Sequence, residues 1–305
     1  MDSLMKEQAI LLFDAYNRAL EEVYEDALEG VENESVLASP EFQIYLQNNV
    51  LNSMQPWFMQ ELEGLSEGTP EAFFDSILSL SDALDIFEIA AQKVDGDLPE
   101  LFLLRLGAFG DEAASALLEL AFAHDWVKPE GMNVMDFHDT LAVDIAAMRV
   151  LGLWKNSFAV TPVLDRFLAL SEPNEFLADG VKSFVIAFEE DIVAELLTRL
   201  AEPADPELGG GYEYLLIFLT QIGMVLPSEE IFQILKDAFR KMKNKVIAVL
   251  CLGDYGDGRV VPLLKSYLDR HLREVDQQFF YETLSVIKRL GGDISDVENP
   301  FRRNG

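Results

Sequence analysis

The chain has 305 residues, half of them hydrophobic, and its 54 acidic against 23 basic side chains give a formal net charge of −31. This composition excludes an intrinsically disordered chain, and the length exceeds that of one ordinary compact core, so we expect two domains or one elongated array. The negative charge repels the phosphate backbone of a nucleic acid, whose binding depends mainly on Lys and Arg. We therefore predict no nucleic-acid partner.

Residues 1–100 are predicted to be helical. In residues 4–28 the apolar side chains recur at intervals of three, four and seven, which is typical of one face of an α-helix. Ser39 and Thr69 each precede a proline and a glutamate. This order marks a helix start, because the cap side chain accepts a backbone hydrogen bond and proline suits the first turn. Without a long alternating run that would predict a strand, we expect an all-α fold, with residues 1–100 as a helical cap or small domain.

Residues 101–300 repeat one pattern. An apolar helix ends near a glycine, a short polar loop follows, and a capping residue opens a second helix with apolar residues at the seventh and eleventh positions. The glycines are Gly107, Gly152, Gly223 and Gly253, and the caps are Asp111, Ser157, Ser228 and Asp257. Such a helix pair buries its apolar stripe only against neighbouring pairs, so the pattern predicts a one-dimensional array.

Residues 252–268, LGDYGDGRVVPLLKSYL, carry a family resemblance. They are similar to the HEAT-like repeat also found in bacterial phycobilin lyases, in which a Leu-Gly, an Asp-containing loop and a Val-Pro pair precede a helix with spaced leucines. Residues 150–170 repeat the segment with one insertion, and Pro162 matches Pro262. The resemblance covers residues 100 to 295. It implies a right-handed α-superhelix of helical hairpins whose second helices line a concave binding surface. We expect residues 301–305 to form a C-terminal tail.

The loop DYGDG, residues 254–258, could cradle a phosphate, hold a cation or turn the chain. Its glycines lack the strand and the Gly-Lys-Ser/Thr of phosphate loops, and its aspartates lack the glutamate that closes a calcium loop. We interpret it as a helix-to-helix turn in which Gly253 ends one helix and Asp257 caps the next. Cys251, set among valine and leucines, is predicted to be a core residue.

Two His-Asp pairs, at residues 124–125 and 138–139, are the strongest chemical candidates. They resemble the metal pair of all-helical phosphohydrolases, with His124, His138 and Asp139 as the ligands. The residues between the pairs are typical of a loop followed by a helix start. An aspartate at a helix start is explained more simply as an N-cap than as a metal ligand. We therefore predict no catalytic residue, metal or cofactor, and keep a metal-dependent phosphohydrolase or a lyase-type accessory subunit as the alternative.

The repeat register places a set of charged side chains on the exposed side of the second helices. The positions after the seventh-place leucine change from acid to base along the chain, which predicts a surface with a charge gradient able to orient an extended or helical partner. These predicted partner-binding residues are Glu119, Asp165, Arg166, Lys236 and Lys265. The alternative is that they are ordinary solvated helix positions.

The acidic excess lies entirely in residues 1–210, which hold 41 acidic and 10 basic side chains, whereas residues 211–305 hold 13 of each. A negative potential of this kind accelerates association with a basic protein. The alternative is that the acidic surface serves only to keep the protein soluble. The single cysteine, the absence of a signal-peptide pattern and the shortness of the most apolar stretch, residues 214–226, favour the cytoplasm and no membrane partner. We predict a non-enzymatic interaction scaffold for a basic or amphipathic protein partner.

Overall fold

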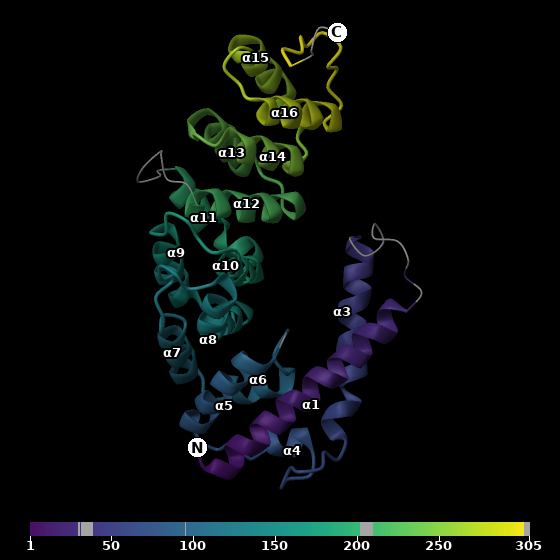
Figure 1. The fold of residues 1–305 in the computed structure, drawn as a ribbon, viewed down its shortest axis with the longest axis vertical. Coiled ribbons are helices and arrows are strands. Elements are labelled where there is room, and N and C mark those ends of the chain that lie inside the picture. Colours follow the sequence, from purple (N-terminus) through teal and green to yellow (C-terminus); the bar gives the residue numbers. More distant parts are fainter. Residues whose placement is uncertain (30, 32–38, 95, 202–209, 302–305) are drawn as a thin grey trace. The chain divides into compact units, whose positions relative to one another are not determined.

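The computed structural model describes residues 1–29, 31, 39–94, 96–201 and 210–301, which form helices and turns without a strand (Figure 1). The all-α prediction is confirmed for this part of the chain. Residues 302–305 of the predicted tail lie outside the described residues. Within the described ranges, no helix combines the length and the apolar character that crossing a bilayer requires.

The chain divides into two compact units. The first unit comprises Met1–His124 and Asn133–Val150, and the second comprises Asp125–Met132 and Leu151–Gly305. Helix α8, Val134–Leu153, belongs mostly to the first unit and its last residues to the second.

The first unit is built on a long helix, α1, which packs against α3 and α5. Its core is aromatic: the rings of Phe74 and Phe102 lie 5.6 Å apart, and Phe13 is 6.0 Å from Phe102. The elements are α1 Ser3–Leu28, α3 Pro40–Met54, the 3-10 helix η1 Pro56–Met59, α4 Pro70–Asp75, α5 Leu80–Lys93, α6 Glu100–Gly107 and α7 Asp111–Leu120. The predicted caps are confirmed, since Ser39 Oγ and Thr69 Oγ1 each accept a backbone N–H three residues later, at 3.2 Å.

The second unit consists of consecutive helices in which α12 packs on α14 and α14 on α16 (Figure 1). Helix α13 also packs against α14, and α15 against α16, so neighbouring helices share one continuous core. The elements are η2 Ser157–Ala159, α9 Val160–Leu168, α10 Glu175–Ala187, η3 Glu189–Ile192, α11 Val193–Ala201, α12 Gly210–Val225, α13 Glu229–Lys241, α14 Lys245–Tyr255, η4 Gly258–Val260, α15 Val261–His271 and α16 Gln277–Arg289.

Three glycines of the repeated pattern allow helices to approach closely. A Cβ on Gly152 would lie 2.8 Å from the Cα of Phe184, and one on Gly223 would lie 2.9 Å from the ring of Tyr255. Gly253 is likewise pressed against Val286 of α16. The prediction that Gly253 ends its helix is wrong: α14 continues to Tyr255 and is closed by Gly256, whose φ of 84° is left-handed. A glycine inside a helix allows close contact between helices because it has no Cβ. A glycine that ends a helix, such as Gly256, instead adopts a positive φ.

The predicted caps of the second helices have mixed outcomes. Ser228 caps α13, because its Oγ accepts the N–H of Ile231 at 3.2 Å. Asp257 caps the short η4 that precedes α15, where its Oδ1 accepts the N–H of Arg259 at 2.9 Å. The predictions for Ser157 and Asp111 are wrong: Ser157 lies inside η2, which Asn156 precedes, and Asp111 is the first residue of α7, where Gly110 occupies the cap position.

Candidate functional site

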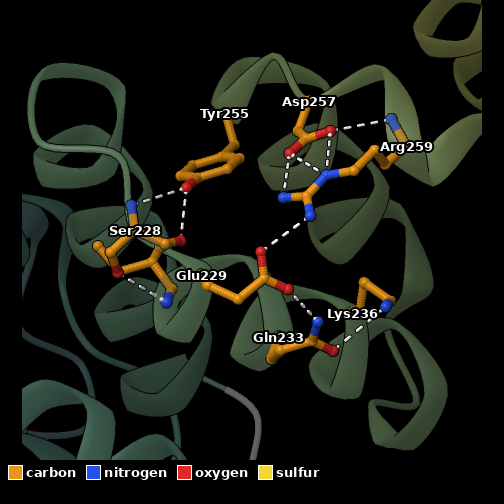
Figure 2. Close-up of polar contacts among 8 residues, drawn as sticks. Ser228, Glu229, Gln233, Lys236, Tyr255, Asp257 and Arg259 are labelled. Atoms are coloured by element: carbon orange, nitrogen blue, oxygen red, sulfur yellow. Dashed lines mark hydrogen bonds and ion pairs between the residues drawn. The ribbon is translucent and has the colours of Figure 1, made fainter.

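A cluster of charged side chains lies where α13 begins and α14 ends (Figure 2). Arg259 Nε donates to Asp257 Oδ1 at 3.1 Å and Oδ2 at 2.8 Å, its Nη2 donates to Asp257 Oδ2 at 2.6 Å, and its Nη1 donates to Glu229 Oε2 at 2.8 Å. Its guanidinium also stacks over the buried ring of Phe232, 4.2 Å from the ring centre. The hydrogen bonds from Arg259 lower the pKa of Asp257. The guanidinium thus links Asp257 to Glu229, and the cluster joins the turn after α14 to the start of α13.

Tyr255 ties the same turn to the start of α13 (Figure 2). Its hydroxyl donates to Ser228 O at 2.8 Å and accepts from Ser228 N at 3.0 Å, and its ring lies nearly parallel to Phe232, 6.2 Å away. The predicted helix-to-helix turn at residues 254–258 is shorter in the structure: Asp254 and Tyr255 belong to α14, and Gly256 and Asp257 connect it to η4.

The five predicted partner-binding residues lie in both units. Glu119 is exposed on α7 of the first unit, and the other four belong to α9, α13 and α15 of the second. Asp165 accepts a hydrogen bond from Arg199 of α11, and Arg166 lies 4.7 Å from the ring centre of Trp126. These contacts engage both charged groups of α9 within the chain.

The two predicted lysines are engaged as well. Lys265 donates to the two carboxylate oxygens of Asp296 at 2.7 and 2.9 Å, and Lys236 donates to Gln233 Oε1 at 3.2 Å. The half-exposed Lys236 also lies 5.0 Å from the ring centre of Phe232. Contacts within the chain therefore engage four of the five predicted residues: Asp165 pairs with the neighbouring α11, Lys236 contacts its own helix, and Lys265 pairs with Asp296 beyond α16. Exposed ion pairs of this kind contribute little to stability.

The two histidines of the metal alternative take separate carboxylate neighbours. His124 Nδ1 lies 2.8 Å from Asp144 Oδ2, and the His124 backbone N–H donates to Asp144 Oδ1 at 3.1 Å. His138 Nδ1 lies 3.6 Å from Asp139. The described residues contain no group of three or more His, Cys, Asp or Glu placed to hold a metal ion.

Asp144 is the residue of this region that the sequence reasoning missed. Its side chain is fully buried in the first unit, and it fastens the segment after α7 to α8 through His124. The available signal is an aspartate within the otherwise apolar run LAVDIAAM of residues 141–148, since a buried carboxylate requires hydrogen-bond donors.

A groove of about 640 Å³ opens in the first unit between α1, α3 and the segment before α6. Its floor contains the buried side chains of Leu20, Met54 and Phe58, while Tyr24 and Leu51 are 41% and 48% exposed. The sequence reasoning left the role of residues 1–100 open. The signal that could have found the groove is the apolar spacing of four along both α1 and α3.

All the charged side chains that line this groove are acidic: Glu21, Asp97 and Glu100. Tyr16 closes one end, where its hydroxyl donates to Asp97 O at 3.3 Å. Burial, with the negative charge of Asp97 as a second cause, raises the pKa of Tyr16 and of Tyr24, so both hydroxyls stay neutral at physiological pH. The groove therefore combines an apolar floor with a negatively charged rim.

No protein-family model, curated protein or solved structure matches the chain. Its function has to be inferred from its own residues.

Proposed function

We propose that the chain is a non-enzymatic adaptor of the cytoplasm that binds a basic or amphipathic protein partner on a HEAT-like array of helical hairpins. The observation that carries the proposal is the packing of α12 on α14 and of α14 on α16, with close contacts at Gly223 and Gly253. Consecutive helix pairs that complete one another's core are the building principle of repeat arrays, which present extended surfaces to protein partners.

The charge of the chain supports a basic partner. The excess of 31 negative charges lies in residues 1–210, and it includes all the charged side chains that line the groove of the first unit. A potential of one sign accelerates the association of a protein of opposite sign and makes the rate depend on salt.

The chemical candidates of the sequence also support binding over catalysis. Asp144 holds His124 through its ring and its backbone, and Cys251 is buried in α14. Burial raises the pKa of the Cys251 thiol to about 11, which suppresses the reactive thiolate. Both residues thereby serve the packing of their units.

Affinity capture from the source cell at low and high salt tests the proposal, with an unrelated protein of similar acidity as the control bait. We expect a basic protein that the chain retains at low salt and the control bait does not, and that binds the purified chain directly. Recovery of the same proteins by both baits, or of none at either salt concentration, would refute the adaptor function.

A further inference from the structure

Two series of apolar side chains line the groove in the first unit. Tyr16, Leu20 and Tyr24 follow one another on α1, and Leu46, Val50 and Met54 follow one another on α3, each four residues apart. Side chains spaced by four form the ridges of a helix surface, and the space between two such ridges accepts a ridge of another helix. Each series spans about 12 Å, since a helix rises 1.5 Å per residue, so the occupant needs at least two turns.

The described residues leave the upper walls of the groove uncovered. Leu20, Met54 and Phe58 are buried at its floor, whereas Tyr24 and Leu51 expose nearly half of their surface above it. Large apolar side chains exposed around a concave site are typical of a surface that binds an apolar partner, because burying them is favourable.

The charge of the rim selects among apolar partners. Among the described residues, the carboxylates of Glu21, Asp97 and Glu100 line the groove and no Lys, Arg or His does, and the sequence of residues 40–54 contains no basic residue either. An acidic helix would be repelled here, and a basic one would place its cations beside the carboxylates while its apolar stripe covers the floor.

We infer that this groove binds one amphipathic α-helix of at least two turns that carries Lys or Arg beside its apolar stripe. The inference rests on the proposed function, because it assigns the helix to the protein partner. It goes further in placing the recognition on α1 and α3 of the first unit, outside the repeat pattern of residues 101–300.

Fluorescence anisotropy on the full chain tests the inference with three labelled synthetic peptides of about 14 residues, four helical turns. The first has leucines at helical spacing and flanking lysines, the second has glutamate in place of every lysine, and the third has the composition of the first in scrambled order. We expect saturable binding of the first peptide alone. Binding of the scrambled peptide with equal affinity would show attraction by net charge without a groove, and absence of binding by the first peptide would also overturn the inference.

Two pairs of variants locate the peptide. Leu51→Glu should weaken binding about tenfold, because a carboxylate enters the apolar wall, whereas Leu104→Glu, at a 63% exposed position on α6 outside the groove, should leave it unchanged. Glu21→Lys should weaken binding about threefold, and Glu22→Lys, next to it on α1 but outside the groove lining, should have no more than the effect of net charge. Equal effects within each pair would overturn the inference.

A photo-crosslinking version of the first peptide covers the case in which Leu51→Glu unfolds the first unit. Crosslinks should map to α1 and α3 of the unmodified chain, and crosslinks elsewhere would refute the groove. Sedimentation of the chain alone adds one outcome: a dimer that Leu51→Glu dissociates, without peptide binding, would assign the groove to a second copy. If Leu51→Glu leaves the binding of a captured partner intact, the groove is not the binding site, and the proposed adaptor function still holds. If the peptide binds specifically but no partner is captured from the cell, the proposed adaptor function is refuted.

Discussion

Replacing Tyr255 by phenylalanine removes one oxygen atom that makes two hydrogen bonds across the turn of Figure 2. The hydroxyl donates to Ser228 O at 2.8 Å and accepts from Ser228 N at 3.0 Å, while the ring keeps its contact with Phe232. A hydrogen bond contributes about 1 kcal/mol net, and the half-buried N–H of Ser228 loses its acceptor, so Tyr255→Phe should lower the free energy of unfolding by about 2 kcal/mol.

Urea unfolding followed by far-ultraviolet circular dichroism measures this change, which amounts to a midpoint shift of about 1 M for an m-value near 2 kcal/mol/M. Tyr214→Phe is the matched control, because the described residues show no hydrogen bond from the Tyr214 hydroxyl and its ring packs on Phe167 and Phe218. Hydrogen exchange should also speed up at the first amides of α13. Equal midpoint shifts for the two variants would refute the reasoning that Tyr255 holds the turn by hydrogen bonds.

The remaining predictions concern three other sites of the second unit. Gly152→Ala should lower the free energy of unfolding, measured with urea, by about 1 kcal/mol, because overpacking against the backbone of Phe184 outweighs the gain in helix propensity. A variant more stable than the unmodified chain would contradict this prediction. Burial raises the pKa of the Cys251 thiol from 9.0 to about 11, so the protonated thiol stabilises the folded state below about pH 9. Between pH 9 and 11 the free energy of unfolding, relative to that of Cys251→Ala, should fall by up to about 2 kcal/mol. Parallel curves of unfolding free energy against pH for the two proteins would contradict this prediction. Lys245→Met should speed amide exchange in the last turn of α13 and cost about 1 kcal/mol, because the Lys245 ammonium donates to three backbone carbonyls at that helix end; unchanged exchange there would count against this role.

The sequence by itself determined the helical character of the chain and several helix starts. Ser39, Thr69 and Ser228 cap helices as predicted, because a cap hydrogen bond joins groups only three residues apart and needs no distant partner. The apolar periodicity is equally local, and it leads to the same all-α result in residues 1–100 and in the repeated pattern.

Only the tertiary structure decided what the glycines and the charged residues do. Gly253 follows the same local pattern as a helix end, yet α14 continues through it, and its missing Cβ leaves room for Val286, 33 positions further along the chain. His124 finds its carboxylate 20 residues away in Asp144, and the groove arises from two helices, α1 and α3, that meet through their apolar stripes. These features depend on contacts between distant segments, and a local pattern states which side chains can pack but not which segment they pack against.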